Sequence, residues 1–161
     1  DAIEADLASR YARANTPDGR RAYLAALGNS AGPRAAAVMN AAIGDPREDI
    51  RMAAARGLRL VPGDATDSRL AAAARKDASA SVRDAALFAI GFRRPLSSTL
   101  WTTVKEAART DPAEAVRNRA IGMLRADTAH RQDAASTLSW VATHDSSEAL
   151  RRLAAANRGT R

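Results

Sequence analysis

The 161-residue sequence contains no cysteine, only two lysines and few aromatic residues, which make up 4% of the chain. The absence of cysteine excludes disulfide bonds and thiolate metal sites, and leaves the redox state of the compartment open. No apolar run reaches the roughly 18–20 residues that a membrane-spanning helix requires. Alanine supplies most of the hydrophobic fraction of 46%. Side chains this small favour closely packed helices over the thick core of a β-sandwich.

One short pattern occurs four times along the chain. It consists of an aspartate, a branched apolar residue at the fifth place after it, an arginine at the sixth and an alanine at the ninth. The aspartates are Asp45, Asp77, Asp111 and Asp145, and the arginines are Arg51, Arg83, Arg117 and Arg151. Adjacent aspartates are separated by 32, 34 and 34 residues. A period of this length is typical of stacked repeats in which each unit is one pair of helices.

Each repeat reads as two helices with the aspartate between them. We expect the aspartate to be the N-cap of the second helix, since its carboxylate can accept a bond from an N–H of the first turn. Pro46 and Pro112 would then occupy the first helical position, where proline is tolerated. A weaker copy lies near the N-terminus, in which Arg20 aligns with Arg51 and Ala14 replaces the aspartate. The predicted units are about 1–28, 33–60, 65–92, 97–125 and 129–158, in one domain over residues 1–161.

The order Asp, five residues, Arg, two residues, Ala in the second helix of a pair resembles the HEAT repeat. The likeness covers residues 33–161 well and residues 1–32 loosely. It implies an all-α, right-handed α-solenoid of about five HEAT-like helix pairs. In HEAT proteins the aspartate and arginine form a ladder that links successive units, so the resemblance implies this structural role for the four aspartates and four arginines. A shorter segment, Leu27–Gly32, is similar to the helical domain of vitellogenin-type lipid carriers, which would imply a secreted setting.

Residues that could support catalysis or metal binding are scarce. The only histidines, His130 and His144, are fourteen places apart, which does not make them a local ligand pair. His144 reads better as a cation near a helix C-terminus. The glycines are dispersed singly and form no phosphate-binding loop. We therefore predict no catalytic residue, no metal site and no cofactor.

The repeat register also defines a face that is expected to bind a partner. In the second helix, the fifth, ninth, tenth and thirteenth places are apolar and face the core, so the fourth, seventh and eleventh places lie on the opposite side. This side is predicted to line a concave surface and to bind protein through Met52, Arg56, Asp84, Phe88 and Asn118. An aromatic ring beside a methionine and an arginine is typical of interface hot spots. The alternative for Phe88 is that its ring folds back over its neighbours.

The two tryptophans fall in different columns of the repeat. Trp101 is predicted to lie in the core. Trp140 occupies the column that holds Asn40, Ala72 and Glu106 in the other units, so it is expected outside the core, with its ring against the adjacent helix.

The net charge of +7 raises the alternative of an anion-binding edge. Arginines recur at the ends of the second helices, at Arg59, Arg93, Arg94, Arg125 and Arg158. They would track phosphates if stacking aligned them, whereas the simpler interpretation is that arginine favours helix C-termini. The 18 acidic residues dilute this edge, and the aromatic residues needed for base stacking are missing.

The expected function is a non-enzymatic scaffold that presents a concave helical surface to a protein partner. Nucleic-acid binding through the arginine edge is the second hypothesis. The third is a helical segment of a lipid-carrier-like protein, which could bind lipid only as part of a larger chain. An enzyme such as the HEAT-type chromophore lyases is the weakest. The sequence shows no targeting segment, leaves the cytoplasm and the cell envelope both open, and leads us to expect further protein before Asp1.

Overall fold

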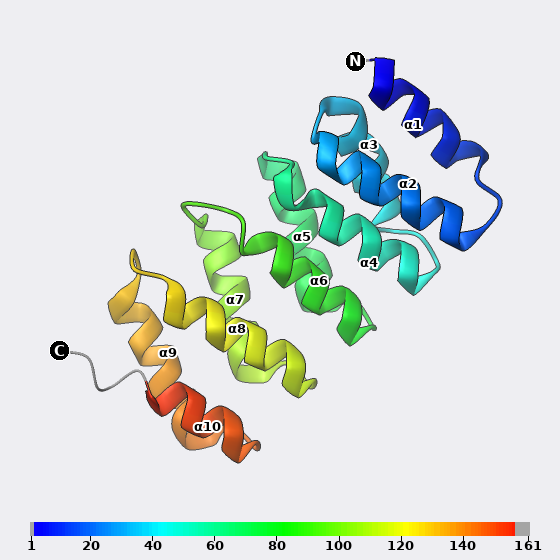
Figure 1. The fold of residues 1–161 in the computed structure, drawn as a ribbon. Coiled ribbons are helices and arrows are strands. Elements are labelled where there is room, and N and C mark those ends of the chain that lie inside the picture. The colour runs from blue at the N-terminus through cyan, green and yellow to red at the C-terminus, as the bar shows by residue number, and fades with distance from the viewer. Residues whose placement is uncertain (1, 157–161) are drawn as a thin grey trace. The chain divides into compact units, whose positions relative to one another are not determined.

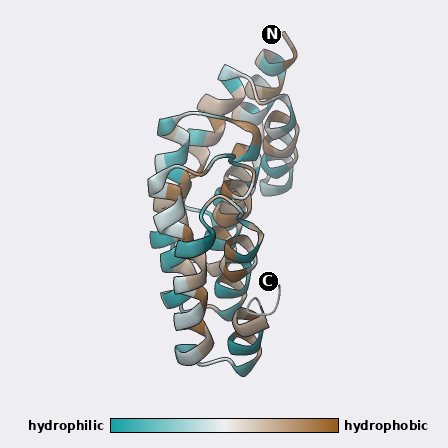
Figure 2. Ribbon diagram, turned by 90° about the vertical axis from the view of Figure 1, so that its left-hand side faces the viewer, coloured by the Kyte–Doolittle hydropathy of each residue, from teal (hydrophilic) through white to brown (hydrophobic). Residues whose placement is uncertain are grey.

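The computed structural model describes residues 2–156, and all regular structure in this range is helical (Figure 1). The chain divides into two compact units, residues 1–94 (unit 1) and residues 95–161 (unit 2). The helices carry both hydrophobic and hydrophilic residues (Figure 2). A helix whose apolar residues recur every three to four positions can bury one side against its neighbours and keep the other in water.

Unit 1 contains three helix pairs. Their helices are α1 (Ala2–Arg13), α2 (Pro17–Ser30), α3 (Pro33–Ala42), α4 (Glu48–Gly57), the short 3-10 helix η1 (Leu58–Leu60), α5 (Asp64–Lys76) and α6 (Ala80–Ile90). The second helices of the pairs, α2, α4 and α6, lie side by side and pack closely in that order (Figure 1). The core of this unit is aliphatic and includes Leu24, Ile50, Leu58, Leu70 and Ile90, all without solvent exposure.

Two glycines bring α2 and α4 into close approach. A Cβ atom on Gly28 would lie 2.7 Å from the Cα atom of Gly57. A Cβ atom on Gly57 would meet the sulfur of Met39, which is itself fully buried. The absence of a side chain at both positions therefore sets how closely these two second helices pack.

Unit 2 contains two helix pairs. Their helices are α7 (Ser98–Thr110), α8 (Glu114–Ala126), α9 (Arg131–His144) and α10 (Glu148–Ala155). The first helices, α7 and α9, pack against each other, and so do the second helices, α8 and α10. Leu100, Val104, Val116, Ile121 and Val141 are buried between them.

The predicted fold class, an all-α solenoid of five helix pairs, is confirmed. The apolar columns are mostly buried, although Leu7 and Val38 are only half-buried. The prediction that each aspartate is an N-cap is wrong. Each second helix begins three residues later, so Pro46 and Pro112 precede the helix instead of opening it.

The aspartates instead form a turn between the two helices of each pair. The carboxylate of each accepts a hydrogen bond from the N–H two residues later, over 2.8–2.9 Å. Such a local side-chain bond satisfies the backbone in a turn and competes with helix formation. Asp77, Asp111 and Asp145 therefore end the first helix, and the second helix starts once the turn is complete.

Candidate functional site

In unit 1 the aspartate of one pair meets the arginine of the preceding pair. Arg51 on α4 donates to both carboxylate oxygens of Asp77, from Nε over 2.7 Å and from Nη2 over 2.9 Å. Its Nη1 donates to the carbonyls of Asp45 and Pro46. The arginine thus fixes its own interhelical turn and the next one at the same time, and a bidentate pair of this kind also fixes orientation.

Unit 2 repeats this arrangement atom for atom. Arg117 on α8 donates to Asp145 from Nε over 2.7 Å and from Nη2 over 3.0 Å, and its Nη1 donates to the carbonyls of Asp111 and Pro112. This pair is deeply placed, since the Arg117 side chain is 9% exposed and that of Asp145 is 2% exposed. We call each such pair, Arg51–Asp77 and Arg117–Asp145, a rung.

A serine and a glutamate accompany each rung. Ser79, two residues after Asp77, donates from its hydroxyl to Glu48 over 2.6 Å. Ser147, two residues after Asp145, donates to Glu114 over 2.9 Å in the same way. The glutamates are the first residues of α4 and α8, where a negative charge also complements the helix dipole.

The remaining ladder arginines bond to their own turns. Arg83 donates to the carbonyl of Asp77, and Arg151 donates to the carbonyl of Asp145. Arg20 donates to the carbonyl of Ala14, and its Nη1 lies 3.8 Å from an oxygen of Asp45. In every repeat the arginine therefore bonds to the carbonyl six residues before it. The linking role of the members outside the two rungs stays a prediction.

The rungs hold their carboxylates in the charged form. Hydrogen bonds from Arg51 keep the pKa of Asp77 below its usual value of 3.8, against the opposing effect of burial. Burial alone would raise the pKa of Asp145, but the bonds from Arg117 and from the N–H of Ser147 outweigh it, so this pKa is lowered as well. Both aspartates stay ionised well below neutral pH.

The predicted protein-binding residues of unit 1 gather on one face of α4 and α6, which we call the α4–α6 face. The guanidinium of Arg56 lies 5.9 Å from the ring centroid of Phe88. The ring of Phe88 meets that of Phe92 edge to face, with centroids 5.1 Å apart. Met52 and Asp84 on the same two helices are half-buried, as is Phe88. Phe88 thus both leans on its neighbours and remains partly open to solvent.

The comparisons with known proteins bear on the fold. A family model for HEAT repeats matches residues 4–91, which is more than half of the chain. The chain belongs to the HEAT-repeat family. No curated protein matches its sequence.

A solved structure, that of the complex of CpcE and CpcF of phycocyanin lyase from Nostoc sp. PCC7120, contains a chain with a similar fold. The TM-score is 0.73 and the sequence identity is 21%. The match covers 97% of this HEAT-repeat chain and 98% of the other chain. At this identity the likeness shows the fold alone.

The arginines at the ends of the second HEAT helices do not form a free edge in unit 1. Arg93 donates to the carbonyls of Leu58, Arg59 and Val61 and to a carboxylate oxygen of Asp67, and its side chain is 10% exposed. The anion-binding role of Arg93 stays a prediction, and its donors already satisfy the carbonyls at the end of α4 and η1.

The other members of the predicted edge differ in their surroundings. Arg59 donates to the side-chain oxygen of Asn29 over 2.6 Å, and Arg94 donates to the carbonyl of Arg93. Arg125 is exposed at the end of α8. Arg158 lies outside the described residues. Fewer arginines of the predicted edge are therefore available to bind an anion than their positions in the repeat indicate.

Asn118 and His130 belong to unit 2. Asn118 is exposed on α8 and lines a groove of about 490 Å³ between α8 and α10. His130 stacks on Trp101, with ring centroids 4.5 Å apart, and its Nδ1 lies 3.1 Å from Asp127. Trp101 is buried, as predicted, and its indole N–H donates to Asp133 over 2.6 Å. His130 therefore packs against Trp101 and Asp127 just before α9 begins.

Two further features concern residues 2–156. No group of three or more histidine, aspartate or glutamate side chains in this range is arranged to hold a metal ion. None of the described helices has the length and apolar character needed to cross a bilayer.

Sequence reasoning missed two surface features of this HEAT-repeat chain. Phe92 lies two residues after the end of α6 and is 51% exposed. Its position one turn after Phe88 was a signal for a shared face. Arg109 on α7 lies 4.4 Å from the ring centroid of Trp140 on α9, a pairing that only the packing of these two helices reveals.

Proposed function

We propose that this chain is a non-enzymatic protein-interaction module whose α4–α6 face binds a protein partner. The observation that carries the proposal is the placement of Arg56 over Phe88, next to the exposed ring of Phe92. Within residues 2–156 the guanidinium of Arg56 makes no hydrogen bond or ion pair, so its donors are available to a partner.

The energetics of this face fit an interface. Burial of the exposed half of a phenylalanine side chain, about 100 Å², contributes roughly 2–3 kcal/mol. The few residues that contribute most of the binding free energy at protein interfaces are enriched in arginine and aromatic side chains. Phe88 holds the Arg56 side chain in place before binding, which lowers the entropy lost when a partner docks.

Two further observations support a protein partner. HEAT repeats stack helix pairs into extended surfaces without requiring catalytic chemistry. The similar chain in the phycocyanin lyase structure lies in a complex of two proteins, CpcE and CpcF, so this fold presents a protein-binding surface there. Lyase activity is not carried over, because a fold by itself does not define a function.

The proposal is tested by site-specific crosslinking. A photoreactive phenylalanine analogue replaces Phe92 in one version of the protein and exposed Arg69 on α5 in another. We expect a protein crosslink at position 92 that Arg56→Glu abolishes and that the matched charge reversal Arg69→Glu leaves intact. Equal crosslinking at positions 92 and 69, or no effect of Arg56→Glu, would contradict the assignment of this face.

Nucleic-acid binding is the weaker alternative. Arg93 and Arg59, two of the five arginines proposed for that role, already donate to groups within the protein. Binding of a nonspecific DNA duplex at two salt concentrations separates the alternatives, since phosphate contacts weaken steeply with salt. Tight binding at low salt that is lost at high salt would favour the nucleic-acid hypothesis over the α4–α6 face.

A further inference from the structure

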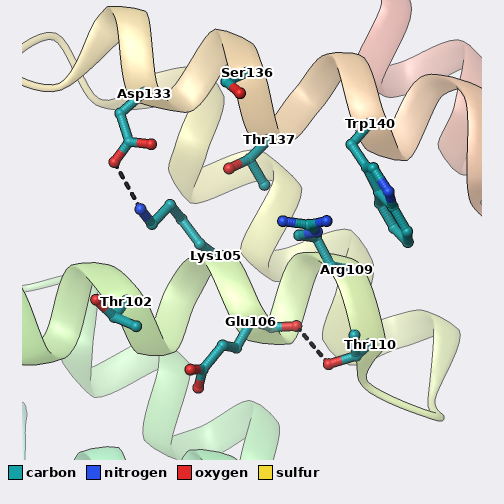
Figure 3. A pocket seen from close by; sticks show the side chains of 9 residues that line it. All are labelled: Thr102, Lys105, Glu106, Arg109, Thr110, Asp133, Ser136, Thr137 and Trp140. Carbon is teal, nitrogen blue, oxygen red and sulfur yellow. Dashed lines mark hydrogen bonds and ion pairs between the residues drawn. The ribbon is translucent and has the colours of Figure 1, made fainter.

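A groove of about 390 Å³ runs between α7 and α9 of unit 2, on the first helices of the two pairs (Figure 3). It lies on elements that the proposed protein-binding face does not use. Its lining is polar and mixed, and includes Lys105, Glu106, Arg109, Asp133, Thr137 and Trp140. A pocket of this size with a few convergent polar groups is typical of a ligand site.

One cation in the groove is neutralised and the other is not. Lys105 donates to Asp133 over 2.7 Å, and the pKa of Asp133 is lowered by this bond and by the bond from Trp101. The Arg109 guanidinium makes no hydrogen bond or ion pair with any residue in 2–156. The Glu106 carboxylate points to the other side of α7 from Arg109 (Figure 3). The groove therefore presents Arg109 as an uncompensated positive charge.

Arg109 is also held in position. Its guanidinium carbon lies 4.4 Å from the ring centroid of Trp140, within the range of a cation–π interaction. A planar guanidinium on an aromatic ring keeps its N–H groups at its edges, where they match the two oxygens of a carboxylate. Part of the entropy cost of fixing this side chain is thus met before any ligand arrives.

A second, independent observation points to a polar ligand. Thr137 is 5% exposed, yet its hydroxyl makes no hydrogen bond with any of the described residues. Its side chain lies in the groove between Lys105 and Arg109 (Figure 3). Among the described residues only Asn40 Oδ1 is a fully buried side-chain atom without a partner, so the Thr137 oxygen is open to the groove and its hydroxyl is free to donate to a bound group.

We propose that the α7–α9 groove binds a carboxylate presented by an extended acidic segment of a protein. Arg109 binds the carboxylate and the Thr137 hydroxyl donates to the same group or to its neighbour. The lining of α7 from Thr102 to Thr110 extends about 12 Å, which accommodates roughly three to four residues of extended chain. A segment of that length reaches both ends of the groove, whereas a single small acid does not.

The test is calorimetric titration of the intact chain with acetyl-(Glu)4-amide at low salt. We expect Arg109→Gln to weaken binding about tenfold or more and Thr137→Val to weaken it severalfold. The control Arg131→Gln removes an exposed arginine of the same unit outside the lining of this groove and should change the affinity less than twofold. The matched glutamine peptide should not bind.

Several outcomes would overturn the assignment. Equal weakening by Arg109→Gln and Arg131→Gln would mean that the peptide senses only the general positive charge. Equal binding of the glutamine peptide would remove the role of the carboxylate, and glutarate binding as tightly as the peptide would replace the protein segment by a small acid. Absence of binding by the wild-type chain would refute the site. None of these results depends on Arg56 or Phe92, so they leave the α4–α6 face untouched.

Discussion

Replacement of Arg117 by alanine is the most direct test of how the repeats are held together. The change removes both bonds to Asp145 and the bonds to the carbonyls of Asp111 and Pro112. It leaves the Asp145 carboxylate, whose side chain is 2% exposed, with its bond from the N–H of Ser147 and only the weaker electrostatic effect of Arg151. Removal of one partner of a buried pair costs about 3–5 kcal/mol, and a charged hydrogen bond contributes about 1.5–3 kcal/mol. We expect a loss of about 3 kcal/mol.

Urea unfolding followed by circular dichroism measures this loss, and a chain of this size should also melt about 6–12 °C lower. The matched control is Arg152→Ala, which removes an ion pair with Glu148 on the surface of α10. The two side chains of that pair are 78% and 64% exposed, so the expected loss is below about 0.5 kcal/mol.

A double-mutant cycle separates the rung from the general effect of losing an arginine. Asp145→Asn in the Arg117→Ala background removes the stranded charge, so the second change should cost far less there than in the wild type. The expected coupling is about 2 kcal/mol. A cost for Arg117→Ala no larger than that for Arg152→Ala would refute the rung as a stabilising element.

Two other predictions concern packing and pH. Gly28→Ala should lower the free energy of unfolding in urea by about 1–3 kcal/mol, because its Cβ would meet the backbone of α4. Gly122→Ala, at an exposed position of α8 with open space around it, should raise that free energy by up to about 1 kcal/mol. The same sign for both substitutions would contradict the close approach of α2 and α4. Asp77 and Asp145 have lowered pKa values in the folded state, so their contribution to stability should be constant above about pH 5. It should fall as the pH drops below 3.8, the ordinary pKa of aspartate, and then through the lower pKa values of the folded state. The urea midpoint at stepped pH measures this loss. Asp77→Asn should flatten this dependence, and an unchanged slope would remove Asp77 as a contributor.

The repeated part of the fold could be predicted because several columns carry the same residues for the same physical reason. The apolar positions five, nine and thirteen places after Asp45, Asp77 and Asp111 recur at helical spacing, and those at Ile50, Val82 and Val116 are fully buried. The arginine at the sixth place always reaches the carbonyl six residues before it. Agreement of this kind among the copies identifies stacked helix pairs from the sequence alone, before the contacts between the helices are known.

The first residue of each second helix could not be predicted from the preferences of residue types for helix caps and turns alone. An aspartate followed by proline at Asp45 and Asp111 fits an N-cap, but it fits a turn equally well. In the structure the carboxylate of Asp77 bonds to the N–H two residues later and also pairs with Arg51, 26 positions before it. A long-range bond of this kind leaves no local signature.

The same limit applies to Arg93 and Glu4. Arg93 stands at a helix end like the other edge arginines, and only the fold shows that three carbonyls from residues 58–61 surround it. Glu4 is buried in α1, where the apolar spacing predicts no charge, and it accepts a bond from Ser30 in the next helix. Both depend on contacts between segments more than twenty residues apart.

The aromatic residues show how the binding surfaces of such a chain can be recognised. The core is built mainly from alanine and branched aliphatic side chains, and Trp101 is the one buried aromatic residue among those that the structure describes. Both phenylalanines of the sequence nevertheless lie together at a surface, and Trp140 lies in a groove with Arg109. The stacking of helix pairs explains the residues that recur in each repeat, such as the rung arginines. It does not explain residues at exposed places that differ from the repeat pattern. In a repeat protein, where each pair needs only its neighbours to fold, such exceptions are the positions at which recognition can vary without loss of the fold.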